Sequence, residues 1–316
     1  MFFPGPVRRM VSDLRPGDHA WLAFAGEDER NLVVGSFIDT ALAGEDKVVV
    51  LAGREEITLP TGDRVTVVPL SEHPSQALDP RRPAQVLRTE IDRAQRAGYR
   101  GVRIVADLTW TLRTPGGAGL VLDCERHIEE VVGPSTSAIA ICQVDRRACR
   151  PRELAALKDA HPVTVTADPD FADSVLRIDR TFHPLGLALS GELDAARHAV
   201  FGEALSQALA RANGSPVHVD MAELKFIDVG ALAMLARAAD ARPRGGPLVL
   251  DRMPAPVRSM VEMIGLDRLP GLRLGIPHPD VHGPDPKGPV PPLRRAGRPG
   301  PPGGSRRARA APCRGG

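Results

Sequence analysis

The sequence predicts an α/β protein with two folded domains and a disordered tail. Short apolar runs alternate with helix-like stretches from Asp18 to about Thr166, which is typical of a largely parallel sheet built from βαβ units. A second, shorter succession of strand-like and helix-like segments occupies residues 173–276. Residues 277–316 are rich in Pro and Gly and almost devoid of large apolar side chains, so they cannot form a core.

The first domain is expected at residues 18–170, after a frayed leader at residues 1–17. Most of its strands read as continuously apolar, as strands covered on both faces do. They are "AWLAFA" (20–25), "KVVVLA" (47–52), "RVTVVP" (64–69), "VRIVAD" (102–107), "SAIAIC" (137–142) and "VTVT" (163–166), with helices at 28–43, 84–97, 118–132 and 151–159. Right-handed crossovers then place helices on both faces of the sheet, which makes three layers.

The second domain is expected at residues 173–276, after a linker at 167–174. Its strands are "LRIDRTF", "LALSGELD", "VHVDM" and "PLVLDRM". Its helices are expected at 195–212, 229–241 and 256–264. Asn213 with Gly214 ends the first of them and Gly265 ends the last, since both residue types adopt the left-handed conformation of a helix C-terminus.

Composition narrows the class of protein. The hydrophobic fraction of 42% and the charged fraction of 25% are those of a soluble globular protein. No apolar run approaches the roughly 20 residues that cross a bilayer, and the four cysteines show no CxxC spacing, so we expect a cytoplasmic protein without a disulfide framework. The tail carries seven arginines, but neither interleaved aromatics nor a recognition fold accompanies them, so nucleic-acid binding is not expected.

Motifs of nucleotide and ester hydrolysis are missing. The Gly-rich loop "TPGGAGLVL" (114–122) has neither the lysine nor the following Ser or Thr of a phosphate-binding loop. The stretch "VVGSFID" (33–39) lacks the second glycine of a nucleophile elbow. We therefore expect no catalytic residue of either kind.

Two aspartates stand out in the apolar stretch "VHVDMAELKFIDVGALAML" (217–235). Asp228 is placed to cap the helix that begins at Val229, and the helix dipole favours its charge there. Gly230 leaves the first turn almost bare, so another surface could approach the backbone. Asp220 is expected to end a strand before the loop "MAELKF" and to bind that loop's amides. Both aspartates could equally be structural caps alone.

Three blocks of the second domain resemble the STAS domains of anti-sigma factor antagonists. They are "LALSGELDAA", "VHVDMAELKFIDVGALAML" and "PVRSMVEMIGLDRL", in that order. The resemblance implies a partner-binding surface for an anti-sigma factor or another signalling protein, which we assign to Asp194, Asp220, Asp228, Val229 and Gly230. In that family, Asp is followed by a phosphorylatable Ser, but this chain has Val229 there and no Ser or Thr from Pro216 to Arg258. A switch by phosphorylation is therefore not expected.

Polar residues lie at the ends of strands in the first domain. His19 and His161 are expected at strand beginnings and Cys142 at the end of a strand, which are opposite edges of a parallel sheet. Glu125 and Glu129 share one helix face at i, i+4, an arrangement more typical of a solvated face than of a catalytic pair. Three ligands without a local spacing rule are not a zinc signature, so no metal centre is predicted.

The first domain resembles MEDS sensory domains through "GDH" (17–19), "VRIVADLTW" (102–110), the acidic helix with Glu125, "AIAICQVD" (138–145) and "HPVTV" (161–165). The resemblance implies a RecA-type fold without the ATP-binding lysine, and contacts to a small organic ligand or a metal at His19, Cys142 and His161. We assign ligand binding to these three residues together with Glu27 and Glu125.

Together, the two domains predict a non-enzymatic cytoplasmic signalling regulator that takes part in transcription regulation and needs no cofactor. The first domain senses a small molecule and the second binds a signalling protein. The alternative is a metal-dependent or ligand-modifying enzyme in the first domain, with hydrolysis at His19 and His161.

Overall fold

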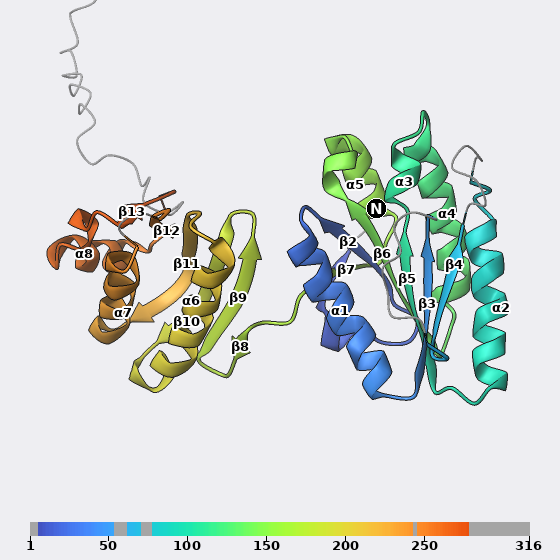
Figure 1. Ribbon diagram of the computed structural model, residues 1–316, viewed down its shortest axis with the longest axis horizontal. Coiled ribbons are helices and arrows are strands. Elements are labelled where there is room, and N and C mark those ends of the chain that lie inside the picture. The colour runs from blue at the N-terminus through green and yellow to red at the C-terminus, as the bar shows by residue number, and fades with distance from the viewer. Residues whose placement is uncertain (1–5, 54–61, 71–77, 243–244, 278–316) are drawn as a thin grey trace, which may run out of the picture. The chain divides into compact units, whose positions relative to one another are not determined.

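The computed structural model describes residues 6–53, 62–70, 78–242 and 245–277 of the 316-residue chain. It contains two separate β-sheets, one in each predicted domain (Figure 1). The predicted tail lies outside the described residues except for its first position. In the described part of the chain, no helix is both long and apolar enough to cross a bilayer.

The first sheet has seven parallel strands in the order β1-β7-β2-β6-β5-β3-β4. The strands are β1 (Val7–Met10), β2 (His19–Phe24), β3 (Asp46–Ala52), β4 (Val65–Pro69), β5 (Gly101–Asp107), β6 (Ala138–Asp145) and β7 (Val163–Thr166). The chain leaves β2 towards β3 on one side and later adds β7 on its other side. The strand order therefore reverses beside β2, and at such a point α/β sheets commonly bind ligands at the carboxyl ends of the strands, the end opposite to His19.

Helices cover both faces of this sheet. They are α1 (Glu27–Ala43), α2 (Arg82–Arg96), α3 (Thr109–Leu112), α4 (Gly117–Val132) and α5 (Pro151–Asp159), with 3-10 turns η1 (Val11–Asp13) and η2 (Arg146–Ala148). Phe37 of α1 lies in the core cluster of one face, whereas Leu87 of α2, Ile128 of α4 and Leu157 of α5 belong to the cluster of the other face. The predicted fold class, a three-layer domain with a parallel sheet, is confirmed.

Two differences from the expected elements affect this domain. Residues Val7–Met10, expected in a frayed leader, form β1 and pair in register with Val163–Thr166 of β7. Strand β6 extends through Asp145, three residues beyond the predicted end at Cys142. The added residues "QVD" include two polar side chains, so an apolar run underestimates the length of the strand.

The second sheet has the order β13-β12-β11-β10-β9-β8. Its strands are β8 (Phe171–Ala172), β9 (Leu176–Phe182), β10 (Leu185–Leu193), β11 (Val217–Ile227), β12 (Leu248–Asp251) and β13 (Leu272–Leu274). Its helices are α6 (His198–Ala212), α7 (Val229–Asp240) and α8 (Ala255–Met263), with turns η3 (Ala195–Arg197) and η4 (Leu266–Arg268). Burial alternates along β11, and Phe201, Leu232 and Val261 from the three helices join its buried residues in a single core.

The expected loop "MAELKF" is wrong, because β11 continues through it to Ile227. The pairing of β10 with β11 shifts register between Ala188 and Ser190, which is a β-bulge, and then resumes. Asp220 lies at this shift, and its carboxylate accepts a hydrogen bond from the Ala222 amide at 3.1 Å. The expected capping of a nearby amide is therefore present, but inside the strand.

Candidate functional site

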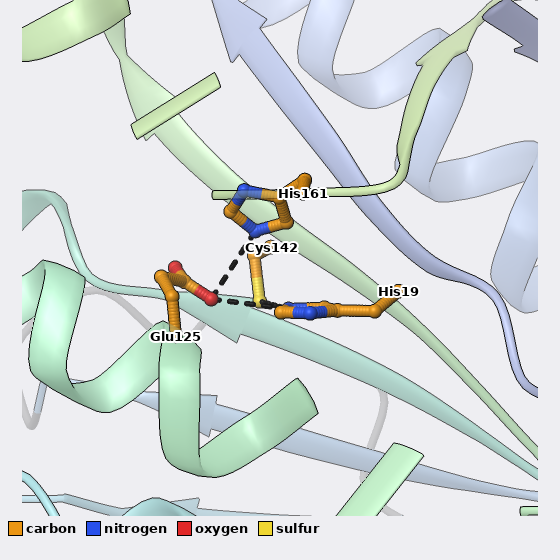
Figure 2. A group of neighbouring side chains, drawn as sticks. All are labelled: His19, Glu125, Cys142 and His161. Atoms are coloured by element: carbon orange, nitrogen blue, oxygen red, sulfur yellow. Dashed lines mark hydrogen bonds and ion pairs between the residues drawn. The ribbon is translucent and has the colours of Figure 1, made fainter. Parts of the chain in front are cut away.

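Four buried side chains meet inside the first domain (Figure 2). His19 begins β2, Glu125 lies on α4, Cys142 lies within β6, and His161 lies between α5 and β7. One ligand atom of each residue lies within 4.8 Å of the others. We call this group the His/Glu/Cys cluster.

Strand order and register explain why these positions meet. Strand β2 lies between β6 and β7, and His19 pairs with Ala140, two residues before Cys142. Side chains two apart on a strand share one face, so Ala140 and Cys142 face the same layer. Since β6 runs past Cys142, that residue lies mid-strand and not at the edge opposite His19. Helix α4 places Glu125 over this face.

In each of the two imidazoles, Nδ1 forms a hydrogen bond with a group outside the cluster, and Nε2 faces the other members of the cluster. His19 Nδ1 lies 2.9 Å from Glu129 Oε2, and His161 Nδ1 lies 2.7 Å from the Leu157 carbonyl oxygen. Because both partners only accept, each Nδ1 carries a proton. His19 Nε2 lies 3.1 Å from Glu125 Oε2 and 3.1 Å from Cys142 Sγ, and His161 Nε2 lies 3.2 Å from Glu125 Oε2.

The cluster is sealed from solvent and strongly coupled. His19, Glu125 and Cys142 are 0% exposed, and His161 is 2% exposed. Burial by itself lowers the pKa of His19, but hydrogen bonds that the ring donates to Glu125 and Glu129 outweigh it and raise that pKa to about 9. Burial favours a protonated Glu125, yet the charges and hydrogen bonds of His161 and His19 hold its pKa below the ordinary range. Burial raises the pKa of the Cys142 thiol well above its usual value.

The structure brings together four of the five residues assigned to ligand binding. Glu27 lies elsewhere, at the start of α1, where it pairs with Arg30 at 3.1 Å. The solvated face expected for Glu125 is wrong, because its side chain is fully buried, whereas the Glu129 side chain is 40% exposed. Glu129 is the residue that the assigned set missed, although the i, i+4 spacing already placed it beside Glu125.

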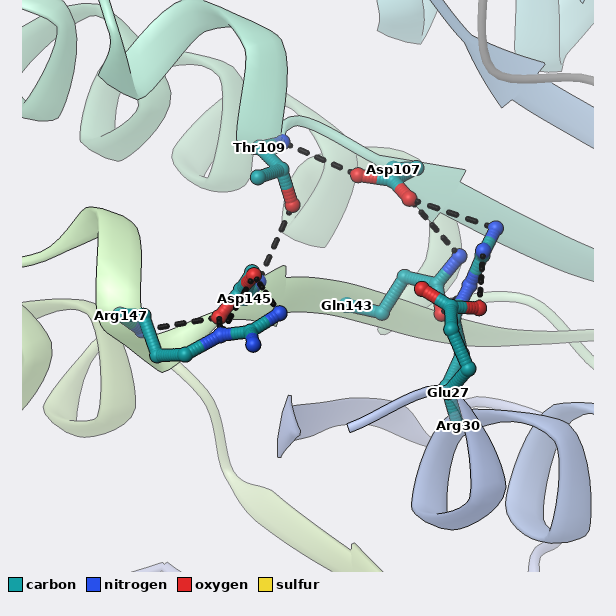
Figure 3. A network of polar contacts seen from close by, with 7 residues as sticks. All are labelled: Glu27, Arg30, Asp107, Thr109, Gln143, Asp145 and Arg147. Atoms are coloured by element: carbon teal, nitrogen blue, oxygen red, sulfur yellow. Dashed lines mark hydrogen bonds and ion pairs between the residues drawn. The ribbon is translucent and has the colours of Figure 1, made fainter. Parts of the chain in front are cut away.

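Glu27 belongs to a second polar network, at the carboxyl ends of β5 and β6 (Figure 3). Arg30 lies 3.5 Å from Asp107 and donates to Gln143 at 3.2 Å, and Gln143 donates to Asp107 at 3.2 Å. The other Asp107 oxygen accepts from the Thr109 amide at 3.0 Å. Asp107, Thr109 and Gln143 are buried and partnered in this way, so the network fixes the ends of the strands.

The predicted partner-binding residues of the second domain meet at the start of α7, except for Asp220. Asp228 Oδ1 accepts from the Ala231 amide at 2.8 Å, as the N-cap prediction requires, and also from His198 Nε2 at 2.8 Å. The His198 ring lies against Gly230, which leaves no room for a side chain there. The side chain of Val229 points outward and is 64% exposed.

Asp194 lies beside Asp228, because the Asp228 amide donates to the carbonyl of Leu193. The Asp194 carboxylate accepts two hydrogen bonds from Arg197, at 2.9 and 3.0 Å. We call Asp194, Asp228, Val229 and Gly230 the α7 surface. Nothing in the sequence singled out His198, since its role depends on the packing of α6 beside α7.

Asp220 lies apart from the α7 surface. Seven residues of extended chain separate it from Asp228, a span of about 26 Å. Its carboxylate forms an ion pair with Arg252, which follows β12. Asp220 therefore has a structural role in joining β11 to the segment after β12.

Comparison with known families identifies both domains. The two folds define a three-layer α/β domain followed by a smaller α/β domain. Residues 18–162 match the model described as MEDS, the methanogen/methylotroph DcmR sensory domain, and residues 176–274 match the model described as Mlab, STAS domain. The chain therefore carries a MEDS domain followed by a STAS domain, as the resemblances implied.

Comparison with individual proteins adds little. No curated protein matches the chain. A protein of Pyrococcus horikoshii OT3 shares 10% identity, with a TM-score of 0.34 over 58% of this chain and 90% of that one. ATPases 2 and 3 of EssC from Geobacillus thermodenitrificans share 9% identity, with a TM-score of 0.26 over 83% and 79%. ATPases 2 and 3 of Thermomonospora curvata EccC share 11%, with a TM-score of 0.24 over 82% and 76%.

Proposed function

We propose that this protein is a non-enzymatic cytoplasmic regulator whose MEDS domain receives a chemical signal and whose STAS domain binds an anti-sigma factor or a similar signalling protein. Both domains belong to regulatory families, one sensory and the other typical of anti-sigma factor antagonists. The signal is a small ligand recognised at the His/Glu/Cys cluster, for which the sequence favours an organic molecule. Partner binding takes place at the α7 surface.

The exposure of Val229 carries the partner-binding part of this proposal. A valine that is 64% exposed at the first position of a helix contributes nothing to its own core. Phe226, three residues earlier, is 47% exposed, so two apolar side chains flank the capped Asp228. Apolar contacts rimmed by fixed charges are typical of a protein-binding surface.

The same position explains why regulation comes from the MEDS domain. A phosphate at the start of α7 would interact favourably with the helix dipole, but Val229 offers no hydroxyl to accept it. The STAS domain therefore lacks the usual covalent input at this site. In its place, binding of the ligand to the MEDS domain controls whether the STAS domain binds its partner.

The enzyme alternative has less support. The two histidines that would perform hydrolysis are 0% and 2% exposed, and all four members of the cluster lie inside the layer between sheet and helices. A hydrolytic metal site needs an open coordination position that substrate can reach. The burial of the cluster therefore favours binding of a ligand and disfavours conversion of a substrate.

Binding of the purified full-length chain to purified anti-sigma factor kinases from the same cell tests the partner proposal. We expect Val229→Arg to weaken the complex at least 100-fold in isothermal titration calorimetry, because it replaces a central apolar contact with a charge. Met263→Arg is the matched control, since Met263 is 83% exposed at the end of α8. A Val229→Arg protein that binds as tightly as Met263→Arg would refute the α7 surface.

A further inference from the structure

The interior of the His/Glu/Cys cluster has an unbalanced set of donors and acceptors. Both Nδ1 atoms are committed to Glu129 and to the Leu157 carbonyl, so both Nε2 atoms point at the same Glu125 oxygen. A neutral imidazole bonded in this way presents a lone pair on Nε2, and a lone pair is not attracted to a carboxylate oxygen. A positive charge between each nitrogen and the oxygen resolves this, either a second proton on the ring or a metal ion that both imidazoles share.

Two of the buried atoms also lack a hydrogen-bond partner within the described part of the chain. They are His161 Nε2 and Glu125 Oε1. His161 Nε2 is near Glu125 Oε2 but does not form an aligned hydrogen bond with it. Since a buried polar atom without a partner costs free energy, two such atoms in one cluster indicate a missing positive ligand.

We propose that His19, Glu125, Cys142 and His161 bind one transition-metal ion of the Zn²⁺ class, through His19 Nε2, a Glu125 oxygen, Cys142 Sγ and His161 Nε2. Bonds of about 2.0–2.3 Å in a tetrahedral site place neighbouring donor atoms about 3.3–3.8 Å apart. The three short separations, 3.1, 3.1 and 3.2 Å, are a few tenths of an ångström below that range. All four ligand atoms lie within 4.8 Å of one another, so the more distant donors move inward by about 1 Å or less when an ion binds.

The outward hydrogen bonds complete the site. Histidines that bind a metal usually donate their other ring nitrogen to a carboxylate or a backbone carbonyl, which fixes the orientation of the ring. His19 donates from Nδ1 to the carboxylate of Glu129, and His161 donates from Nδ1 to the backbone carbonyl of Leu157. Glu129 is thus a positioning residue that orients His19 without touching the ion.

The donor set decides which ions fit. Two imidazoles, one thiolate and one carboxylate suit Zn²⁺, Co²⁺ or Fe²⁺, whereas Mg²⁺ and Ca²⁺ prefer oxygen ligands alone. Four protein ligands fill a tetrahedral sphere, so this site is closed and not catalytic. The ion joins β2, β6, α4 and the segment after α5. The inference rests on the proposed function for the place of the site and puts a metal ion there instead of an organic molecule, and metal binding by the chain does not depend on any partner.

Titration of the reduced, metal-stripped full-length chain with Co²⁺ tests the site. We expect one equivalent to bind, with a thiolate-to-cobalt charge-transfer band and the intense visible bands of tetrahedral cobalt. Cys142→Ser removes the charge-transfer band, whereas Cys149→Ser, which changes a half-buried free thiol outside the cluster, keeps it. Glu129→Gln weakens binding about 10- to 100-fold without changing the band, as expected of a positioning residue.

Zn²⁺ provides a second readout that does not depend on any variant. At a concentration about a hundredfold above its Kd, Zn²⁺ should raise the unfolding midpoint of the MEDS domain by about 5–10 °C. Absence of stoichiometric Co²⁺ or Zn²⁺ binding by the wild-type chain overturns the proposal, and so does an unchanged charge-transfer band in Cys142→Ser. Either result leaves partner binding at the α7 surface intact, because that is measured separately with Val229→Arg.

Discussion

Replacement of Asp228 by alanine and by asparagine separates the two interactions that this carboxylate makes. Alanine removes both the cap on the Ala231 amide and the contact with His198. Asparagine keeps a capping oxygen, since Asn and Asp are equally good N-caps, but it has no charge. The comparison therefore measures the cap by itself, at the surface where partner binding is proposed.

The magnitude follows from the two contacts. Loss of an N-cap costs about 1 kcal/mol, and loss of a largely surface ion pair costs about 0.2–1 kcal/mol. Asp228→Ala should thus lose about 1–2 kcal/mol, which makes amides in the first turn of α7 exchange about 5- to 30-fold faster. Asp228→Asn should lose only the ion-pair part. Hydrogen exchange measured by mass spectrometry reports both, with α8 (Ala255–Met263) as the internal control.

The effect has a defined dependence on pH. Partial burial favours a raised pKa for Asp228, but the Ala231 amide and His198 outweigh it and hold the pKa below its ordinary value. The stabilisation is therefore complete above the unfolded-state pKa of about 4 and is lost as the pH falls through the lower folded-state pKa. Wild type and Asp228→Asn should converge only when the pH is below this lowered folded-state pKa. Equal exchange in Asp228→Ala and Asp228→Asn at neutral pH would refute the capping role.

Three further predictions concern the STAS domain. Asn213→Ala should destabilise it by about 1 kcal/mol because Asn213 has a φ of 43° at the end of α6, whereas Asn213→Gly should not; urea unfolding distinguishes them. Phe201→Ala should cost about 3–5 kcal/mol, since that ring is fully buried, and calorimetry should show the STAS transition lowered while the MEDS transition is unchanged. Val229→Ser should become phosphorylated at residue 229 by an anti-sigma kinase that binds the chain, whereas the wild-type peptide should not; tryptic mass spectrometry reports the modification.

Local patterns predicted most of the fold. Continuous apolar runs identified β2, β3 and β5 within a residue or so, and helix-like spacing identified α1, α4 and α5. Where patterns failed, a non-local contact decided the outcome. Val7–Met10 carries two arginines and becomes a strand because β7 offers a free edge. Residues 222–227 of β11 remain extended because β10 continues to pair with them past the bulge.

The candidate sites divide in the same way. Asp228 was predictable as a cap because the cap and its helix are adjacent in the sequence. The meeting of residues 19, 125, 142 and 161 was not, because it depends on β2 lying between β6 and β7 and on α4 crossing that face. The sequence by itself determined which elements form and which residue types they carry, since hydrophobic periodicity and capping act over a few residues. Strand order and register are set by packing among distant segments, so only the tertiary structure decided which polar side chains share one buried space.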